Sequence, residues 1–274
     1  MTHMNILENP AVSRSRPPMT FLRGFLVVVE FEIKALRYSS GTLLTQAVVN
    51  PAVYLLLLGA GIASAIASAR GVEDLSGYLA FLVPGVIAVQ ALNTFHRVMW
   101  RAAVDRQWGL SAMKRVYGVS PAAYVPGMLV APAVLALAQT ATIALCAVLL
   151  GLRFTPEQLG LFAAGTVLSA LFWGCLGLLA TYALQKQDRR NTIVNLLFLP
   201  LTFAAPTYYA LDAMPTYMQV IAAVNPLTYH VQSMRPEDGV TAVSLMISGL
   251  LVLSCLIATV WKVARTELLS RGHA

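Results

Sequence analysis

The chain has 274 residues, of which 58% are hydrophobic and only 11% are Asp, Glu, Lys or Arg. Soluble domains carry about 45–50% apolar and about 25% charged residues, so this composition excludes a water-soluble enzyme, and it also excludes a disordered chain. The formal charge of +7 is then an orientation signal in a membrane rather than a nucleic-acid-binding patch, and no nucleic-acid partner is expected.

The N-terminal part precedes the long apolar segments. Residues 1–20 are polar, contain several prolines and lack the apolar core of a signal peptide, so we expect a flexible cytoplasmic tail. Residues 21–38 place charged side chains on one helical face and apolar side chains on the other, and Glu30 and Lys34 have the spacing of an i,i+4 ion pair. This pattern predicts an amphipathic helix in the cytoplasmic interface, with the polar start of the first span as the alternative.

Six segments are apolar and long enough to cross a bilayer, which takes roughly 20 residues. They are Thr42–Ala63, Tyr78–Met99, Gly127–Leu152, Leu159–Leu184, Thr192–Leu211 and Val240–Trp261. With a cytoplasmic N-terminus, 16 of the 19 Lys and Arg residues lie inside, and only Arg70, Arg153 and Arg235 lie outside. The positive-inside rule therefore predicts that both termini are cytoplasmic, that residues 39–264 form one six-span domain and that 265–274 form a short cytoplasmic tail.

The cytoplasmic loop at 97–121, between the second and third spans, is amphipathic. A helical projection of Arg101–Tyr117 aligns apolar residues at every fourth position from Val104 to Val116, and charged residues cover much of the remaining surface. Gly118 and Ser120-Pro121 are expected to end the helix, because a proline disfavours a helical conformation in the residue before it. Such a helix can dock a partner, and attachment of a basic loop to the membrane surface is the alternative.

A further apolar stretch, Thr216–Ser233, contains Pro226 and precedes the last span. A seventh full span at this place would put the basic C-terminal residues outside, against the positive-inside rule. The sequence therefore predicts a re-entrant or interfacial hairpin at 212–235 on the outer face.

Several kinds of chemistry have no residues to carry them. No acidic residue lies in the middle of a predicted span, so a proton- or sodium-driven carrier has no obvious coupling residue. None of the four lysines follows a glycine, so the chain has no P-loop, and ATP would have to be bound by another polypeptide. No nucleophile–base pair and no Cys/His cluster with metal-ligand spacing is present, so we expect neither enzyme activity nor a metal site.

Motifs in chain order resemble the permease subunits of type-2 ABC exporters, the ABC-2 group that includes drug, polysaccharide and nodulation-factor exporters. The motifs are Asn50-Pro51, Phe81-Leu82-Val83-Pro84-Gly85, Asp105-Arg106 with Gly109, Met113 and Ser120-Pro121, Leu211-Asp212-Ala213-Met214-Pro215, and Asn225-Pro226-Leu227-Thr228-Tyr229 with Arg235. The resemblance implies an all-α membrane protein of the type-2 ABC exporter fold, with six transmembrane helices, an N-terminal interfacial helix, a cytoplasmic coupling helix and an outer re-entrant hairpin.

This chain departs from the family pattern near the predicted exit side. It has Ala204-Ala205-Pro206-Thr207 where many relatives carry a Ser-Gly step, and His230 and Gln232 stand where a small residue and an acid are expected. These departures leave the family class unchanged and bear on the substrate.

The resemblance also implies partners and an activity. Two permease subunits, either two copies of this chain or this chain and a related permease, would pair in the lipid membrane with two copies of a cytoplasmic ABC ATPase. That ATPase would hold ATP and Mg, so this chain needs no cofactor of its own. The complex would export a hydrophobic or amphipathic compound, drug-like rather than a lipid-linked glycan, across the bacterial cytoplasmic membrane by alternating access. A secondary transporter and a non-transporting scaffold that recruits a cytoplasmic enzyme are the alternatives.

The same resemblance assigns candidate sites. The ATPase-coupling residues would be Arg101, Asp105, Arg106, Trp108, Gly109, Met113, Lys114 and Arg115. The substrate path along the second and fifth spans would include Gln90, Asn93, Thr94, Asn195, Phe198, Thr202 and Phe203. The outer hairpin or gate would include Pro215, Asn225, Pro226 and Tyr229. Interhelical packing is the alternative role of the polar span residues, and an interfacial belt is the alternative for the outer aromatics.

Overall fold

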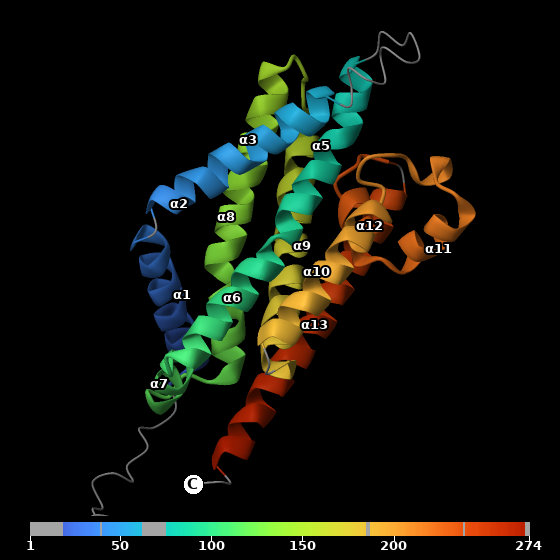
Figure 1. Cartoon of the computed structure of the whole chain (residues 1–274). Helices are drawn as coiled ribbons and strands as arrows, with labels where there is room; N and C mark the ends of the chain where they lie inside the picture. Colours follow the sequence, from blue (N-terminus) through green and yellow to red (C-terminus); the bar gives the residue numbers. More distant parts are fainter. Residues whose placement is uncertain (1–18, 39, 62–74, 185–186, 238, 272–274) are drawn as a thin grey trace, which may run out of the picture.

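The computed structural model describes residues 19–38, 40–61, 75–184, 187–237 and 239–271, and every regular element within these ranges is helical (Figure 1). The longer helices are α1 (Phe21–Tyr38), α5 (Leu75–Leu92), α6 (Thr94–Gln107), α8 (Pro121–Leu149), α9 (Pro156–Ala183), α10 (Gln187–Phe203) and α13 (Val240–Arg271). The shorter elements are α2 (Ser40–Leu44), α3 (Asn50–Tyr54), π-helical turns at Thr45–Val49 and Leu55–Ala60, α7 (Leu110–Val116), a 3-10 turn at Leu211–Ala213, α11 (Thr216–Val224) and α12 (Pro226–Gln232).

Helices α8 and α9 begin with the same local signal. Ser120 precedes α8 and accepts a hydrogen bond from the backbone N–H of Ala123, and Pro121 occupies the first turn, where no donor is needed. Thr155 precedes α9 and forms a reciprocal capping box with Gln158. The predicted stop before the third span is confirmed, because α7 ends at Val116 and the next helix begins at Pro121.

Helix α9 is the centre of the bundle, because it packs against α5, α6, α8, α12 and α13. Its buried face carries Trp173 and several small residues that admit close neighbours. At Gly177, a Cβ atom would collide with the backbone of Phe95 in α6. The Thr181 hydroxyl donates to the backbone carbonyl of Met99 across the same interface, at 3.1 Å. Small residues thus bring the two helices into backbone contact, as in other membrane bundles.

The described residues contain four helices that are long and apolar enough to cross a membrane, judged by length and composition. These are Ser76–Gln107, Pro121–Leu149, Pro156–Ala183 and Val240–Thr266, and they correspond to four of the six predicted spans. The predicted first span follows α1 after a bend of 90°, and this bent pair counts as a fifth candidate if it is one span. The all-helical fold is confirmed for the described residues, which contain four span candidates, or five if the bent pair is one span.

The predicted fifth span, Thr192–Leu211, is shorter than expected. Helix α10 has 17 residues and ends at Phe203, where the chain leaves the helix for a turn that contains Pro206. The predicted outer hairpin at 212–235 consists of the 3-10 turn and of α11 and α12, which lie beside the bundle toward the end opposite α7 (Figure 1). Helix α12 contacts α5, α9 and α13, so this segment is packed onto the bundle.

Candidate functional site

The turn between α6 and α7 differs from the prediction of one helix over Arg101–Tyr117. Helix α6 continues the second span to Gln107, and α7 is a separate helix that begins at Leu110. Between them Gly109 has a φ of +69°, a left-handed conformation that favours glycine. The prediction of a single coupling helix is therefore wrong. A helical projection assumes one straight helix and cannot show that the chain turns at a single residue.

Four large apolar side chains are exposed around this turn, and we call them the α7 tip: Trp108, Met113, Val116 and Tyr117. Trp108 is 76% exposed and Val116 is 73% exposed. They lie at the end of the molecule that carries α7, away from α11 and α12 (Figure 1). An exposed apolar cluster of this kind marks an interaction surface.

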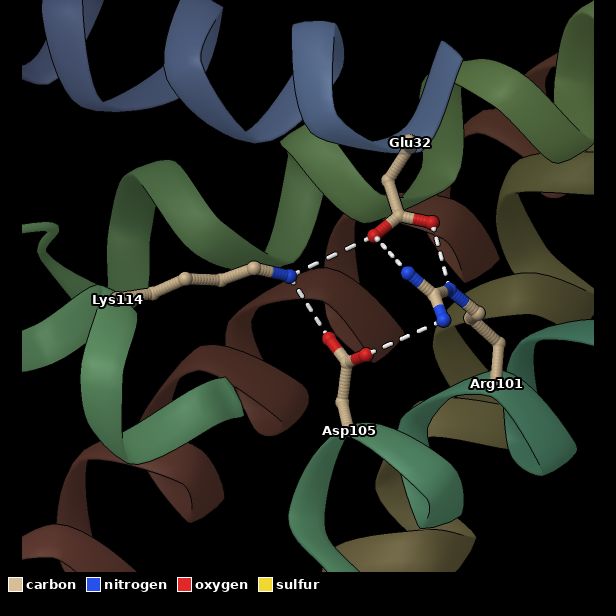
Figure 2. A network of polar contacts seen from close by, with 4 residues as sticks. All are labelled: Glu32, Arg101, Asp105 and Lys114. Atoms are coloured by element: carbon tan, nitrogen blue, oxygen red, sulfur yellow. Dashed lines mark hydrogen bonds and ion pairs between the residues drawn. The ribbon is translucent and has the colours of Figure 1, made fainter. Parts of the chain in front are cut away.

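Behind the α7 tip, four charged side chains form a buried network (Figure 2). Lys114 Nζ lies 2.7 Å from Asp105 Oδ2 and 3.5 Å from Glu32 Oε1. Arg101 closes the ring, because its Nε lies 3.1 Å from Glu32 Oε2 and its Nη1 lies 3.4 Å from Asp105 Oδ1. Asp105 is completely buried, and Glu32 and Lys114 are nearly so. Two acids and two bases compensate one another, as buried charges require.

The network joins three helices that come from distant parts of the chain. Glu32 belongs to α1, Asp105 and Arg101 to α6, and Lys114 to α7. The ring of Phe31 covers it, with the ring centroid 4.4 Å from Lys114 Nζ. Because a buried ion pair is costly to break, α1, α6 and α7 are held together as one unit at this end of the bundle.

Two predicted coupling residues, Asp105 and Lys114, therefore lie in the interior instead of on the surface, and a third, Arg101, is half-buried. The sequence analysis assigns no role to Glu32, because other residues define the charged face of α1. The spacing of Glu32 could have indicated its burial, since Gly24, Val28 and Glu32 follow one another at intervals of four residues and form the buried stripe of α1. A carboxylate on the apolar stripe of an amphipathic helix indicates a buried partner.

The other predicted coupling residues lie around the same turn. Arg106 donates from Nη1 to the backbone carbonyl of Thr181 at 2.7 Å and lies over the ring of Tyr182, which attaches α6 to the last turn of α9. Trp108 and Met113 are part of the α7 tip, Gly109 forms the turn, and Arg115 is half-buried on α7.

The residues predicted along the substrate path are divided between the interior and the surface. Gln90 and Thr94 are buried within the protomer, and the half-buried Asn93 donates to Gln90 Oε1 at 3.2 Å. Phe203 is exposed, and Thr202 donates to the backbone carbonyl of Phe198 in its own helix.

Phe198 is half-buried and packs against two aromatic residues of α6. Its ring centroid lies 4.2 Å from that of His96 and 5.4 Å from that of Phe95. The side chain of Asn195 lies outside the described part of the structure.

The predicted outer residues build the local structure of α11 and α12. Asn225 is buried, caps α12 by accepting from the backbone N–H of Leu227 at 3.0 Å, and donates to the backbone carbonyl of Leu201 at 2.7 Å. Pro226 occupies the first turn of α12, and Pro215 precedes α11. The Tyr229 hydroxyl donates to the backbone carbonyl of Ala223.

The segment 204–210, which follows α10, is bound to α3, to α5 and to Arg235, three residues beyond α12. The Tyr78 hydroxyl donates to the carbonyl of Tyr208 at 3.2 Å, and the hydroxyls of Tyr54 and Tyr208 are 3.0 Å apart. Arg235 donates to the carbonyl of Pro206 at 2.7 Å. These hydrogen bonds hold α3, α5 and the segment 204–210 together at the end opposite α7.

Comparisons with known proteins agree with this architecture. The family model described as ABC-2 type transporter matches residues 23–236, a range that includes the whole network and the segment 204–210. The candidate transport permease ycf38 of Cyanophora paradoxa is 27% identical over 233 residues, which cover 83% of this chain and 78% of the relative. The inner membrane transport permease YadH of Escherichia coli K12 is 23% identical over 200 residues, which cover 70% of this chain and 73% of the relative. YadH of Shigella flexneri matches to the same extent. Because the family match extends over well more than half of its residues, the chain belongs to the ABC-2 type transporter family and is a transmembrane permease of that type.

Proposed function

We propose that this chain is the membrane subunit of an ATP-driven exporter and that the α7 tip docks on a separate cytoplasmic ABC ATPase. The observation that carries the proposal is the position of four exposed apolar side chains directly on a buried, neutral ion network. The apolar side chains of the α7 tip supply an area for docking. Separating the buried charges behind the tip would cost much free energy. Movement of the tip would then be transmitted to α1 and to the second span together.

The remaining parts of the proposal rest on the family and on the charge distribution. Two permease subunits and two ATPase subunits would form the complex, and ATP and Mg would be held by the ATPase. The α7 end carries most of the basic residues, so it would face the cytoplasm, and the protein would lie in the inner membrane, as the name of YadH states for that relative. The cargo would be a hydrophobic or amphipathic compound, because the spans that carry the predicted path are mostly apolar apart from the path residues themselves.

The test compares two exposed valines in short helices at opposite ends of the molecule. Val116 in α7 is 73% exposed and Val224 in α11 is 79% exposed. Val116→Glu places a charge in the docking surface and is expected to reduce copurification of a co-expressed ABC ATPase from the same genome at least about tenfold. Val224→Glu is the matched control and is expected to leave copurification unchanged.

Other outcomes separate the alternative functions. Equal ATPase recovery with both variants would contradict docking at the α7 tip. Transport that persists in ATP-depleted vesicles would favour a secondary transporter. Copurification of a cytoplasmic enzyme without any ATP-dependent transport would favour a scaffold.

A further inference from the structure

A cavity of about 280 Å³ lies at the end of the bundle opposite α7. It is bounded by the N-terminal parts of α5 and α9, the loop between α8 and α9, and the segment that connects α12 to α13. Its wall contains both apolar and charged residues. The residues that matter for its chemistry are Phe81, Pro84, Phe162, Arg153, Arg235 and Glu237.

Arg235 is the most constrained of the charged residues. It is only 9% exposed, and its guanidinium lies 3.9 Å above the ring of Phe81. Its Nη2 donates to the backbone carbonyls of Pro206 at 2.7 Å and Phe81 at 3.3 Å, whereas its Nε is buried without a partner. Burial lowers the pKa of Arg235 to about 10, so the side chain, which follows α12 and lies outside the four span candidates, stays ionised at neutral pH.

None of the ion pairs among the described residues includes Arg235 or Arg153. Glu237 lines the same cavity, and its charge acts to raise the pKa of Arg235, but the two side chains form no ion pair. A buried charge that is held by carbonyls and an aromatic face and only partly neutralised is costly. An anion in the adjoining cavity would remove that cost.

A second cation converges on the same place. Of the three basic residues that the sequence assigns to this side of the membrane, Arg153 and Arg235 both line this cavity, and Arg70 lies outside the described residues. They are separated by 82 positions in the chain and are brought together by the packing of α5, α9 and α12. Two arginines and one glutamate leave the wall with a net positive charge.

The apolar residues of the wall indicate what accompanies the anion. Phe81, Pro84 and Phe162 form a surface suited to a hydrocarbon or aromatic group. A second cavity of about 620 Å³ shares Phe81, Arg235 and Glu237 with the first, so a longer ligand has room on both sides of Arg235.

We propose that this cavity binds an anionic amphiphile, with a phosphate or carboxylate between Arg153 and Arg235 and the apolar part along Phe81, Pro84 and Phe162. Arginine suits this role because its planar donors match both kinds of anion. The ligand comes either from the membrane, as an anionic phospholipid, or from solution, as a free anion. Binding of this ligand does not require an ATPase, so it can be tested independently of the docking of the α7 tip.

The experiment measures lipid binding to the purified full-length chain in a non-ionic detergent by native mass spectrometry. Phosphatidylglycerol is titrated against phosphatidylcholine with identical acyl chains, and the wild type is expected to bind the anionic lipid at least about fivefold more tightly. Arg153→Gln should weaken phosphatidylglycerol binding about fivefold, and Arg153→Lys should retain it. Glu237→Gln should strengthen it at least about twofold, because it removes the only acidic side chain from the wall that the structure describes.

Arg265→Gln is the control, because Arg265 is an exposed arginine near the far end of α13 and should have no effect. Competition distinguishes the two sources of the ligand: displacement of the lipid by millimolar inorganic phosphate assigns a free-anion site, and resistance assigns a lipid site. Equal binding of the two lipids by the wild type would overturn the proposal. Equal behaviour of Arg153→Gln and Arg265→Gln, or no gain with Glu237→Gln, would overturn it as well.

Discussion

At the scale of single residues, burial separates the charges that hold the fold from those that are solvated. Glu30 and Lys34 form an ion pair at 2.5 Å, but both side chains are mostly exposed. Glu32 lies two positions away in the same helix, is buried, and contacts both Arg101 and Lys114. Exposed pairs contribute little to stability, whereas removing one partner of a buried network leaves an uncompensated charge.

Glu32→Gln is therefore expected to destabilise the protein by about 3–5 kcal/mol, because Arg101 and Lys114 would keep two positive charges against Asp105 alone. The measurement is thermal unfolding in detergent. Glu30→Gln is the matched control one half-turn away, and its unfolding temperature should stay close to that of the wild type.

Restoring the charge balance should recover stability if the network acts as one unit. The double variant Glu32→Gln/Lys114→Met has one acid and one base left, and it should unfold at a higher temperature than Glu32→Gln alone. A double variant that is as unstable as the sum of its two single variants would argue against coupling between these side chains.

At the scale of helices, the bundle depends on how closely α6 approaches α9. Gly177 is a point of close approach, because its missing side chain leaves room for the backbone of Phe95. The buried hydroxyl of Thr181, one turn later, bonds across the same interface. The α6–α9 contact thus positions the helix that leads directly to the α7 tip.

Gly177→Ala is expected to destabilise the protein by about 1–3 kcal/mol, since the new methyl group would force the two backbones apart. Gly160→Ala tests the same substitution in the same helix, at a position with no neighbour within 4 Å. There the higher helix propensity of alanine should leave stability unchanged or slightly increased. The measurement compares the unfolding temperatures of the two variants. Equal effects of the two substitutions would exclude a steric cause.

At the scale of the whole molecule, the two ends of the bundle differ in chemistry. One end has the α7 tip above the neutral ion network, and the other has the cavity with Arg153 and Arg235. The segment 204–210 is bound by hydrogen bonds at the second end. This difference between the two ends fits the proposal that an ATPase docks on one side of the membrane and an amphiphile binds on the other.

The orientation can be tested with single cysteines at the two ends. Arg153→Cys should react with a membrane-impermeant maleimide in intact cells, and Met113→Cys should react only after permeabilisation, as the positive-inside rule requires. The native cysteines are buried or half-buried, so the unmodified chain is the background control. The reverse labelling pattern would contradict a cytoplasmic α7 tip.

The membrane class, four of the span candidates and the helix starts at Pro121 and Pro226 follow from local properties of the sequence. Composition and hydrophobic length decide whether a segment can cross a bilayer. Ser120-Pro121 and Asn225-Pro226 set helix starts through caps and missing donors that involve only neighbouring residues. These are local properties of the chain, and they do not depend on which helices pack together.

Which charges are buried and what they contact depends on how the helices pack. Glu32 meets Arg101 and Lys114 across 69 and 82 positions, and Arg153 shares a cavity with Arg235 across a similar separation. The reversal at Gly109 turned the predicted coupling helix into two helices, and α10 ended before it reached the predicted length. A helical projection shows the faces of one isolated helix. The contacts between charged side chains depend instead on the packing of several helices. Charged residues that are expected at the surface are therefore buried in the ion network.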